Sequence, residues 1–315
     1  MLSDDGTHPE NRELIRAGPI HAPPYTRIQG LVYALELYTI PGGKIQRKAE
    51  EGLASDVTRG QPGSLSVRMG RLDMTLDSAS LERLVPDDLA SGDATGLETL
   101  ALHVERYEFA ARRLPSGRLL DVGCGVGYGT ALLAERSGVA ARAIGVDISP
   151  EAIAYAQERY GRSQVEFRIG NVLTFEDVAE FEGIVALEIV EHVEEPKALV
   201  EHLTTLLRPG GVLVASVPTT PSMDLNPHHR HDFTERSFRG LFNEYELTEM
   251  DCLRQRQRVP VGAVLRRREA RMQDLRRGLG RFYLRHPMSL LHRLHATATR
   301  GFANCYTTIA WRKEG

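Results

Sequence analysis

The sequence predicts an α/β fold in which a doubly wound, mostly parallel sheet carries helices on both faces. Short apolar runs recur from residue 96 onward, helical patterns separate them, and the first run leads into the glycine-rich stretch 123–129. Alternation of buried strands with amphipathic helices is typical of parallel sheets. Such sheets bind ligands beyond the carboxyl ends of their strands, so we expect the functional residues there.

Local patterns predict the elements of the expected core, residues 96–253. Residues 97–113 carry apolar side chains on one helical face, and Ser149 with Pro150 begins a second helix that ends at Gly161. Apolar runs predict strands at 119–122, 143–146, 165–169, 183–187 and 212–217, with helices at 126–137 and from Pro196. Two further strands are expected at 245–253 and 303–311.

The regions outside the core differ from it in composition. Residues 1–95 form an expected accessory region, where alternating apolar residues at 28–48 and 65–76 indicate a small, partly β structure. Residues 254–300 hold 13 arginines and only two acidic residues, in a chain whose net charge is −3. We therefore expect a basic, helical insertion that contacts an anion, followed by a last strand of the core within 301–315.

The overall composition is that of an ordinary globular protein, with 42% hydrophobic and 26% charged residues. No apolar run approaches the roughly 18 residues that a membrane-spanning helix needs. The three cysteines, Cys124, Cys252 and Cys305, are scattered and lack metal-ligand spacing, which favours a cytoplasmic protein with reduced thiols.

A glycine loop and two acidic residues predict a nucleotide site. Glycines stand at 123, 125, 127 and 129, and Asp147 ends the next apolar run. No Gly-x-Gly-x-x-Gly frame fits, because its last position is Tyr128 or Thr130. Asp121, just before the loop, adds negative charge where a pyrophosphate would be repelled. A cofactor that carries an ammonium and a sulfonium group would gain from the same charge.

The loop resembles motif I of class I S-adenosylmethionine (SAM)-dependent methyltransferases. Further landmarks resemble a bacterial group of this family that acts on small molecules, glycans and lipids, and together they cover about half of the chain. They are His103-x-x-Arg106-Tyr107, Val146-Asp147-Ile148-Ser149, Glu191-His192-Val193, Arg208-Pro209-Gly210-Gly211 and His228-x-x-His231-Asp232-Phe233-Thr234. The resemblance implies a Rossmann-like sheet of seven strands, the last antiparallel, and SAM as the cofactor.

The resemblance also implies which residues contact SAM. Asp147 would hold the ribose hydroxyls, the backbone of the loop would lie along the methionine part, and Arg106 with Tyr107 would approach the cofactor's carboxylate. Asn171 replaces the acid that commonly accepts from the adenine amino group, and its side-chain carbonyl still accepts. The full set is Arg106, Tyr107, Asp121, Gly123, Cys124, Gly125, Gly127, Asp147, Ile148, Asn171, Val172 and Glu188.

Methylation of a hydroxyl requires a general base or a metal ion, because the hydroxyl is barely ionised at neutral pH. Candidates follow the strands expected at 183–187 and 212–217: Glu191, His192, His228, His229 and His231, with Asp232 beside them. A structural role in fastening the turns is the alternative for each. The spacing of the histidines and Asp232 suits a divalent ion, but no second ligand cluster is evident, so no metal site is predicted.

We therefore expect a SAM-dependent methyltransferase that methylates oxygen on a small-molecule, saccharide or lipid acceptor, with the insertion as part of the substrate cover. A stripe of Met288, Leu291, Leu294 and Ala298 packs on the core or contacts a membrane surface. Few aromatic residues lie among the arginines, which disfavours nucleic acid. The alternatives are a non-catalytic SAM-binding scaffold and an RNA methyltransferase, and the oligomeric state is open.

Overall fold

The computed structural model describes residues 84–86, 89, 94–136, 142–258 and 275–315. The chain divides into two units, Met1–Gln46 and Arg47–Gly315, and all of the described residues belong to the second. The strands expected at 28–48 and 65–76 lie outside the described residues, as does most of the expected accessory region. Among the described residues, no helix combines the length and apolar character needed to cross a bilayer.

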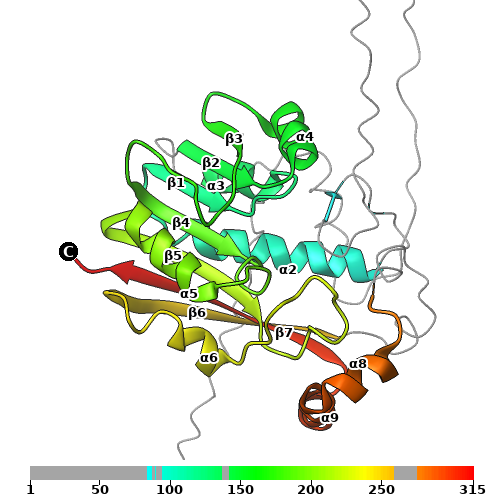
Figure 1. Cartoon of the computed structure of the whole chain (residues 1–315). Helices are drawn as coiled ribbons and strands as arrows, with labels where there is room; N and C mark the ends of the chain where they lie inside the picture. The colour runs from blue at the N-terminus through cyan, green and yellow to red at the C-terminus, as the bar shows by residue number, and fades with distance from the viewer. Residues whose placement is uncertain (1–83, 87–88, 90–93, 137–141, 259–274) are drawn as a thin grey trace, which may run out of the picture. The chain divides into compact units, whose positions relative to one another are not determined.

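The described part of the chain forms one seven-stranded sheet in the order β3-β2-β1-β4-β5-β7-β6 (Figure 1). The first five strands run parallel to their neighbours, and β7 is antiparallel to both β5 and β6. This order confirms the predicted α/β class. The strands are β1 (Arg118–Val122), β2 (Arg142–Asp147), β3 (Val165–Ile169), β4 (Phe181–Leu187), β5 (Leu207–Pro218), β6 (Leu247–Arg258) and β7 (Ala303–Lys313).

The helices begin and end largely where local signals place them. The helix α4 begins at Pro150, and the Ser149 hydroxyl accepts from the Ala152 N–H at 3.2 Å, as an N-cap should. It ends before Gly161, as predicted. The described helices are α2 (Ala94–Ala111), α3 (Tyr128–Arg136), α4 (Pro150–Tyr160), α5 (Pro196–Leu206), α6 (Glu235–Gly240), α8 (Leu279–Arg285) and α9 (Pro287–Arg300).

The largest differences from the sequence-based expectation concern two strands and one helix. The strand β6 extends to Arg258, because its polar residues pair with β7 along its whole length. The strand β5 begins at Leu207, although the register shifts before Val212 and Gly210 has a φ of 74°. The short helix α6 was not predicted, and a reciprocal cap between Thr234 and Ser237 fixes its start.

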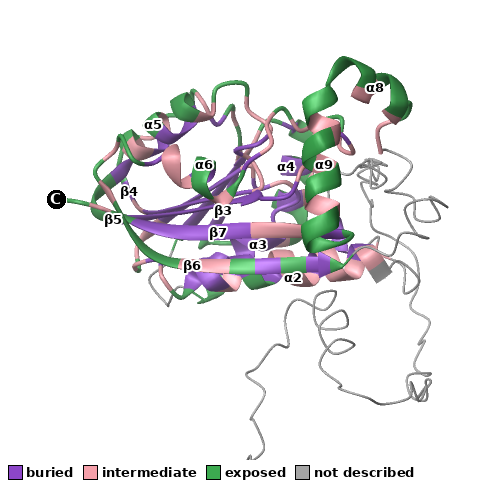
Figure 2. Cartoon of the chain, turned by 90° about the horizontal axis from the view of Figure 1, so that it is seen from below, coloured by how far each residue is buried: buried purple, intermediate pink, exposed green. Residues whose placement is uncertain are grey.

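The core lies on both faces of the central strands β4, β5 and β7, whose middle residues are buried (Figure 2). Ile184, Leu213 and Ile309 are each fully buried. On one face Phe242 stacks on Trp311, with ring centroids 3.8 Å apart and an interplanar angle of 16°. Covering both faces with apolar groups leaves the strand ends as the places where polar side chains gather.

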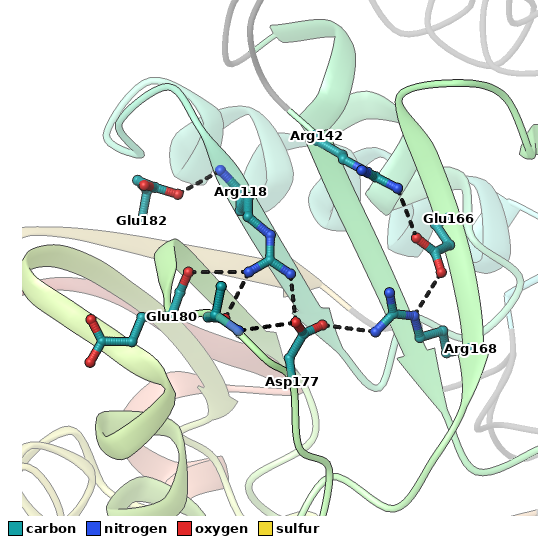
Figure 3. Close-up of polar contacts among 8 residues, drawn as sticks. Arg118, Arg142, Glu166, Arg168, Asp177, Glu180 and Glu182 are labelled. Carbon is teal, nitrogen blue, oxygen red and sulfur yellow. Dashed lines mark hydrogen bonds and ion pairs between the residues drawn. The ribbon is translucent and has the colours of Figure 1, made fainter.

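An ion-pair network joins the loop before β4 to the strands β1, β2 and β3 (Figure 3). Asp177 lies 2.7 Å from Arg118, the first residue of β1, and 2.8 Å from Arg168 of β3. Glu166 lies between Arg168 and Arg142, the first residue of β2. Because Arg118 and Arg142 open their strands, this network fixes the sheet at the edge opposite the carboxyl ends of β1 and β2.

The helices α8 and α9 attach to the loop that follows β5. Asp224 is buried there and accepts from the Tyr283 hydroxyl at 2.6 Å and from Arg293 Nε at 2.7 Å. The Arg276 N–H donates to the Leu225 carbonyl at 2.7 Å. The Arg293 guanidinium and the Tyr283 hydroxyl outweigh the burial of Asp224 and hold the pKa of its carboxyl below its usual value. The described part of the insertion is therefore fixed to a loop at the carboxyl edge of the sheet.

Substitution of Gly129 tests the packing beneath the glycine loop. A Cβ atom on Gly129 would lie 1.9 Å from Cζ of Tyr107, an overlap that requires the ring to move. Alanine in a helix gains about 1 kcal/mol over glycine. Overpacking of this severity costs about 1–3 kcal/mol, so we expect Gly129→Ala to lower the free energy of unfolding in urea. Gly240→Ala is the control, since nothing lies within 4 Å of its Cβ position; equal effects of both would contradict this account.

Candidate functional site

The glycine loop bridges the carboxyl ends of β1 and β2. The N–H groups of Gly123 and Cys124 both donate to the Val146 carbonyl, at 2.8 and 3.0 Å. Gly123, Gly125 and Gly127 have φ values of 72°, 54° and 86°, a region that favours glycine. The sequence of alternating glycines therefore folds into a turn that other residues would strain.

The individual glycines have different roles in this loop. A Cβ on Gly127 would lie 2.6 Å from the Ala156 side chain and 2.7 Å from the Phe167 ring, so this glycine permits close packing inside the protein. A Cβ on Gly125 would meet no protein atom within 4 Å. The backbone at Gly125 therefore borders open space at the carboxyl edge, where a ligand can approach it closely.

Asp147 fastens the loop and faces its outer side. One carboxylate oxygen accepts from the Gly125 N–H at 2.9 Å, and the other accepts from the Ser149 N–H at 2.9 Å. Each carboxylate oxygen has a further lone pair, so both can also accept from a vicinal diol. This geometry suits the role in ribose binding that the sequence predicts for Asp147.

Asp121 lies beneath the loop as a buried carboxyl group with hydroxyl donors. It is 1% exposed, accepts from Thr130 Oγ1 at 2.6 Å, and accepts from the Tyr107 hydroxyl at 3.1 and 3.2 Å. Burial raises the pKa of Asp121 from 3.8 to about 7, the two hydroxyl donors offset part of that rise, and the nearby Asp147 charge adds to it. A cation bound here would stabilise the ionised form.

Arg106 and Glu188 form an ion pair at the end of β4. Arg106 of α2 is 1% exposed, lies over the Tyr306 ring at 4.5 Å, and has its Nη1 2.8 Å from Glu188 Oε1. Glu188 is the one non-glycine residue with positive φ in the described part of the chain, at 52°. The Ser216 hydroxyl donates to Glu188 Oε1 at 2.7 Å. A strained residue held by such partners is typical of a functional site.

Further residues complete this region, and sequence reasoning assigned no role to them. Tyr128 and His103 share a hydrogen bond, and both rings pack edge-on against Tyr107. The spacing of His103 and Tyr107 on one helix could have indicated their proximity. Nothing in the sequence pattern indicates Thr130 or Ser216, because their contacts arise only when the strands assemble.

Residues after β2 and β3 border the loop with mixed chemistry. Ile148, next to Asp147, is 71% exposed, which is unusual for a large apolar side chain beside a polar site. The Asn171 side-chain oxygen accepts from the Leu173 N–H at 2.9 Å and retains one lone pair for a ligand. The side chain of Val172 lies in the core, at 9% exposure, so only its backbone is available to contact a ligand. Burial raises the pKa of the Cys124 thiol well above its usual value, so a packing role fits this cysteine.

The structure brings three of the predicted catalytic residues together. Glu191 is fully buried, and its Oε1 lies 4.0 Å from Nε2 of His192. The ring of His229 meets that of His192 edge to face, with centroids 4.7 Å apart. Burial, with His192 and His228 nearby, lowers the pKa of His229 from 6.5 to about 3. At neutral pH His229 is therefore an uncharged imidazole.

The remaining candidates in this group have other surroundings. His231 Nε2 lies 3.1 Å from the Val193 carbonyl and 3.2 Å from the Glu194 carbonyl, so it joins the loops after β5 and β4. Asp232 accepts from the N–H groups of Ser222 and Met223, at 2.7 and 3.0 Å. His228 is exposed. These contacts favour positioning roles for His231 and Asp232.

Replacement of Asp121 by asparagine tests the cost of the buried charge. Between about pH 4 and pH 7 the folded state holds a proton that the unfolded state releases, so stability falls as pH rises through this range. Above pH 7 the decrease in the free energy of unfolding is complete, and it is on the order of 4 kcal/mol for a pKa raised by about three units. We expect Asp121→Asn to unfold at higher urea concentration than the wild type near pH 8, with a smaller difference near pH 5. A difference that is the same at both pH values would contradict the raised pKa.

Three comparisons place this arrangement among known proteins. Residues 120–215 match the family model described as a methyltransferase domain. A protein of Mycolicibacterium smegmatis named as a probable SAM-dependent methyltransferase is 34% identical over 156 residues, 47% of this chain and 55% of that protein. The ubiquinone biosynthesis O-methyltransferase of Xylella fastidiosa is 37% identical over 122 residues, 37% of this chain and 48% of that protein.

The fold agrees with the sequence matches. A solved structure of a candidate methyltransferase from Bacillus halodurans is 14% identical and covers 67% of this chain and 99% of that one, with a TM-score of 0.50. The chain spans about half the length of the curated relatives it matches. The matched region contains the glycine loop, Asp121, Asp147 and the Glu191–His192 turn. Residues 120–215 therefore match a methyltransferase domain, in agreement with the resemblance to class I SAM-dependent methyltransferases that the sequence motifs predict.

Proposed function

We propose that this protein transfers a methyl group from SAM to an oxygen atom of a small-molecule, saccharide or lipid acceptor. One observation carries the proposal: two carboxylates, Asp121 and Asp147, flank a glycine loop whose Gly125 backbone borders open space. A ligand that fits must offer hydroxyls to Asp147 and positive charge to Asp121. SAM offers both, and it supplies an activated methyl group on a sulfonium when bound.

The residues present fit the cofactor part by part. A methionine moiety has an ammonium and a carboxylate, and the site has the carboxyls of Asp121 and Glu188 beside the buried guanidinium of Arg106. In the structure Arg106 and Glu188 lie 2.8 Å apart. Opposite charges held this way match a zwitterion without leaving a buried charge uncompensated. The exposed Ile148 gives an apolar surface for adenine.

The acceptor side of the site lies between the turn after β4 and the loop after β5. Glu191 and His192 come from the turn, His229 comes from the loop, and the same loop holds α8 and α9 through Asp224. In-line displacement at a methyl carbon gains most of its rate from positioning. Removal of the acceptor's proton is the remaining requirement, and we assign it to the cluster of Glu191, His192 and His229.

Two observations support oxygen as the atom methylated. The 37% identical relative in Xylella fastidiosa is named an O-methyltransferase. The turn after β4 reads Glu188-Ile189-Val190-Glu191 and lacks the Asn-Pro-Pro-Tyr run that holds a planar nitrogen in amide and adenine methyltransferases. An acid–imidazole pair at this turn suits a hydroxyl, which must lose a proton before or during attack.

The surface of α8 and α9 supports an acceptor associated with anionic lipid. Leu284, Met288, Leu291 and Leu294 are 86%, 59%, 56% and 56% exposed, and Figure 2 shows these helices as largely exposed. Arginines 277, 281 and 285 lie exposed on the same segment. Leucines flanked by arginines suit the boundary between acyl chains and headgroups, and the few aromatic rings of the segment, Phe282 and Tyr283, offer little surface on which RNA bases could stack.

Substitution of Asp147 tests cofactor binding. Asp147→Asn removes a charged acceptor of two ribose hydroxyls, worth about 1.5–3 kcal/mol, so affinity for SAM in calorimetry should fall about 10–100-fold. The exposed Asp251 provides the matched control as Asp251→Asn. Undiminished SAM affinity in the Asp147 variant would contradict the proposed site. Tight SAM binding without transfer to any hydroxyl compound would favour the scaffold alternative.

Vesicle binding tests the lipid surface. We expect the wild type to float with phosphatidylcholine vesicles that contain about 30% phosphatidylglycerol and to detach at high salt. Replacement of Leu291 and Leu294 by aspartate should abolish flotation. Val178→Asp is the control, because Val178 is fully exposed and lies outside α8 and α9. If the double variant floats as well as the wild type, this surface does not contact lipid.

A further inference from the structure

The turn after β4 and the loop after β5 are joined through backbone contacts. The Glu191 carbonyl accepts from the N–H groups of Arg230 and His231, at 2.8 and 3.3 Å. The His192 N–H donates to the Ile189 carbonyl at 3.1 Å. These bonds fix the backbone on both sides of the cluster, so the side chains of Glu191, His192 and His229 start from rigid positions.

One carboxylate and two imidazoles converge between these two loops. The candidate ligand atoms of Glu191, His192 and His229 all lie within 4.8 Å of one another. Glu191 is fully buried, and the two histidines are partly buried. No second group of ligands beside the histidines of 228–232 was evident from the sequence, and the fold supplies one from the turn after β4.

The contact of His229 with Ser222 indicates which of its ring nitrogens carries the lone pair. Its Nδ1 lies 2.7 Å from the Ser222 hydroxyl, and that hydroxyl lies 3.4 Å from Asp232 Oδ1. If Ser222 donates to Asp232, the Nδ1–H of His229 donates to Ser222. The Nε2 atom then carries the lone pair. Metal-binding histidines commonly donate their other ring N–H to a carboxylate, a backbone carbonyl or water, and here the Ser222 hydroxyl, next to Asp232, takes that place.

We propose that Glu191, His192 and His229 bind a divalent transition-metal ion of the Zn²⁺ type. Two imidazoles with one carboxylate favour such an ion over Mg²⁺, which prefers oxygen ligands. Bonds of about 2.1 Å in a tetrahedral site place ligand atoms about 3.4 Å apart, so the three side chains would close by roughly 1 Å. Three protein ligands leave a coordination position open.

The open position gives the ion a role in methyl transfer, an extension that rests on the proposed function. With the ion bound, the cluster would promote loss of the acceptor's proton through the ion, and no side chain of the cluster would accept that proton itself. The acceptor hydroxyl would bind the ion, which lowers its pKa, and release a proton to solvent. The resulting alkoxide would form a bond to the methyl carbon while the carbon–sulfur bond breaks and its electron pair stays on sulfur. The methylated acceptor, S-adenosylhomocysteine and one proton are then the products.

A metal titration of the full chain tests the site without reference to activity. After dialysis against a chelator, Co²⁺ should bind with one-to-one stoichiometry and give visible absorption bands typical of a tetrahedral site. We expect Glu191→Gln and His229→Ala to lower Co²⁺ affinity by more than about 100-fold, and Ser222→Ala to lower it about 10–100-fold. His295→Ala on α9 removes an exposed histidine and should bind as the wild type does.

The outcomes separate this inference from the proposed function. Each variant is also titrated with SAM, and thermal unfolding checks that it is folded. Wild-type protein that binds SAM but takes up no Co²⁺, or variants of Glu191 and His229 that bind Co²⁺ as the wild type does, would overturn the metal site and leave the methyltransferase proposal standing. Wild-type protein that binds Co²⁺ but not SAM would overturn the proposed methyltransferase function and leave the metal site standing.

Discussion

The buried carboxyl of Asp121 is the constraint on which the rest of the site depends. A carboxyl group at 1% exposure is unfavourable when ionised, and its pKa of about 7 expresses that cost. Tyr107 and Thr130 hold it in place, and Gly129 leaves room for the Tyr107 ring. A fold that keeps such a group beneath a glycine loop is arranged for a ligand that brings positive charge.

The sheet places the buried Asp121 in a site to which strand ends and later loops both contribute. The parallel strands β1, β2 and β4 end at the same edge, so Asp121, Asp147 and Glu188 lie toward that edge although they are far apart in sequence. The loop after β5 adds His229 on one flank and holds α8 and α9 through Asp224 on the other. In the proposed function, cofactor contacts come from the first strands and acceptor contacts come from the later loops.

Features that depend on residues close in sequence could be predicted from the sequence. The glycine spacing, Asp147 at a strand end, and the Ser149–Pro150 helix start are set by residues close in sequence, and the structure has the loop, the strand and the helix there. The number of strands and the antiparallel last strand follow from the family resemblance, and the topology confirms both. Boundaries such as the end of β6 depend on pairing with β7, which no local pattern reveals.

The candidate site was predictable only in part, because many of its contacts join residues that are far apart in sequence. Three histidines within a few residues look equivalent in sequence, but only His229 meets His192, while His231 contacts backbone carbonyls and His228 is exposed. The pairing of Arg106 with Glu188 likewise joins α2 to the end of β4. These distinctions arise from how loops meet after the sheet has formed.

The pH dependence of SAM affinity tests the central claim most directly. In calorimetry between about pH 5.5 and pH 7, where the amino group of SAM stays protonated, affinity should rise with pH because binding requires ionised Asp121, and protons should be released on binding. In Asp121→Asn, affinity should be lower and nearly independent of pH over this range. An equal rise in both proteins would contradict the account, and so would wild-type protein with no affinity for SAM.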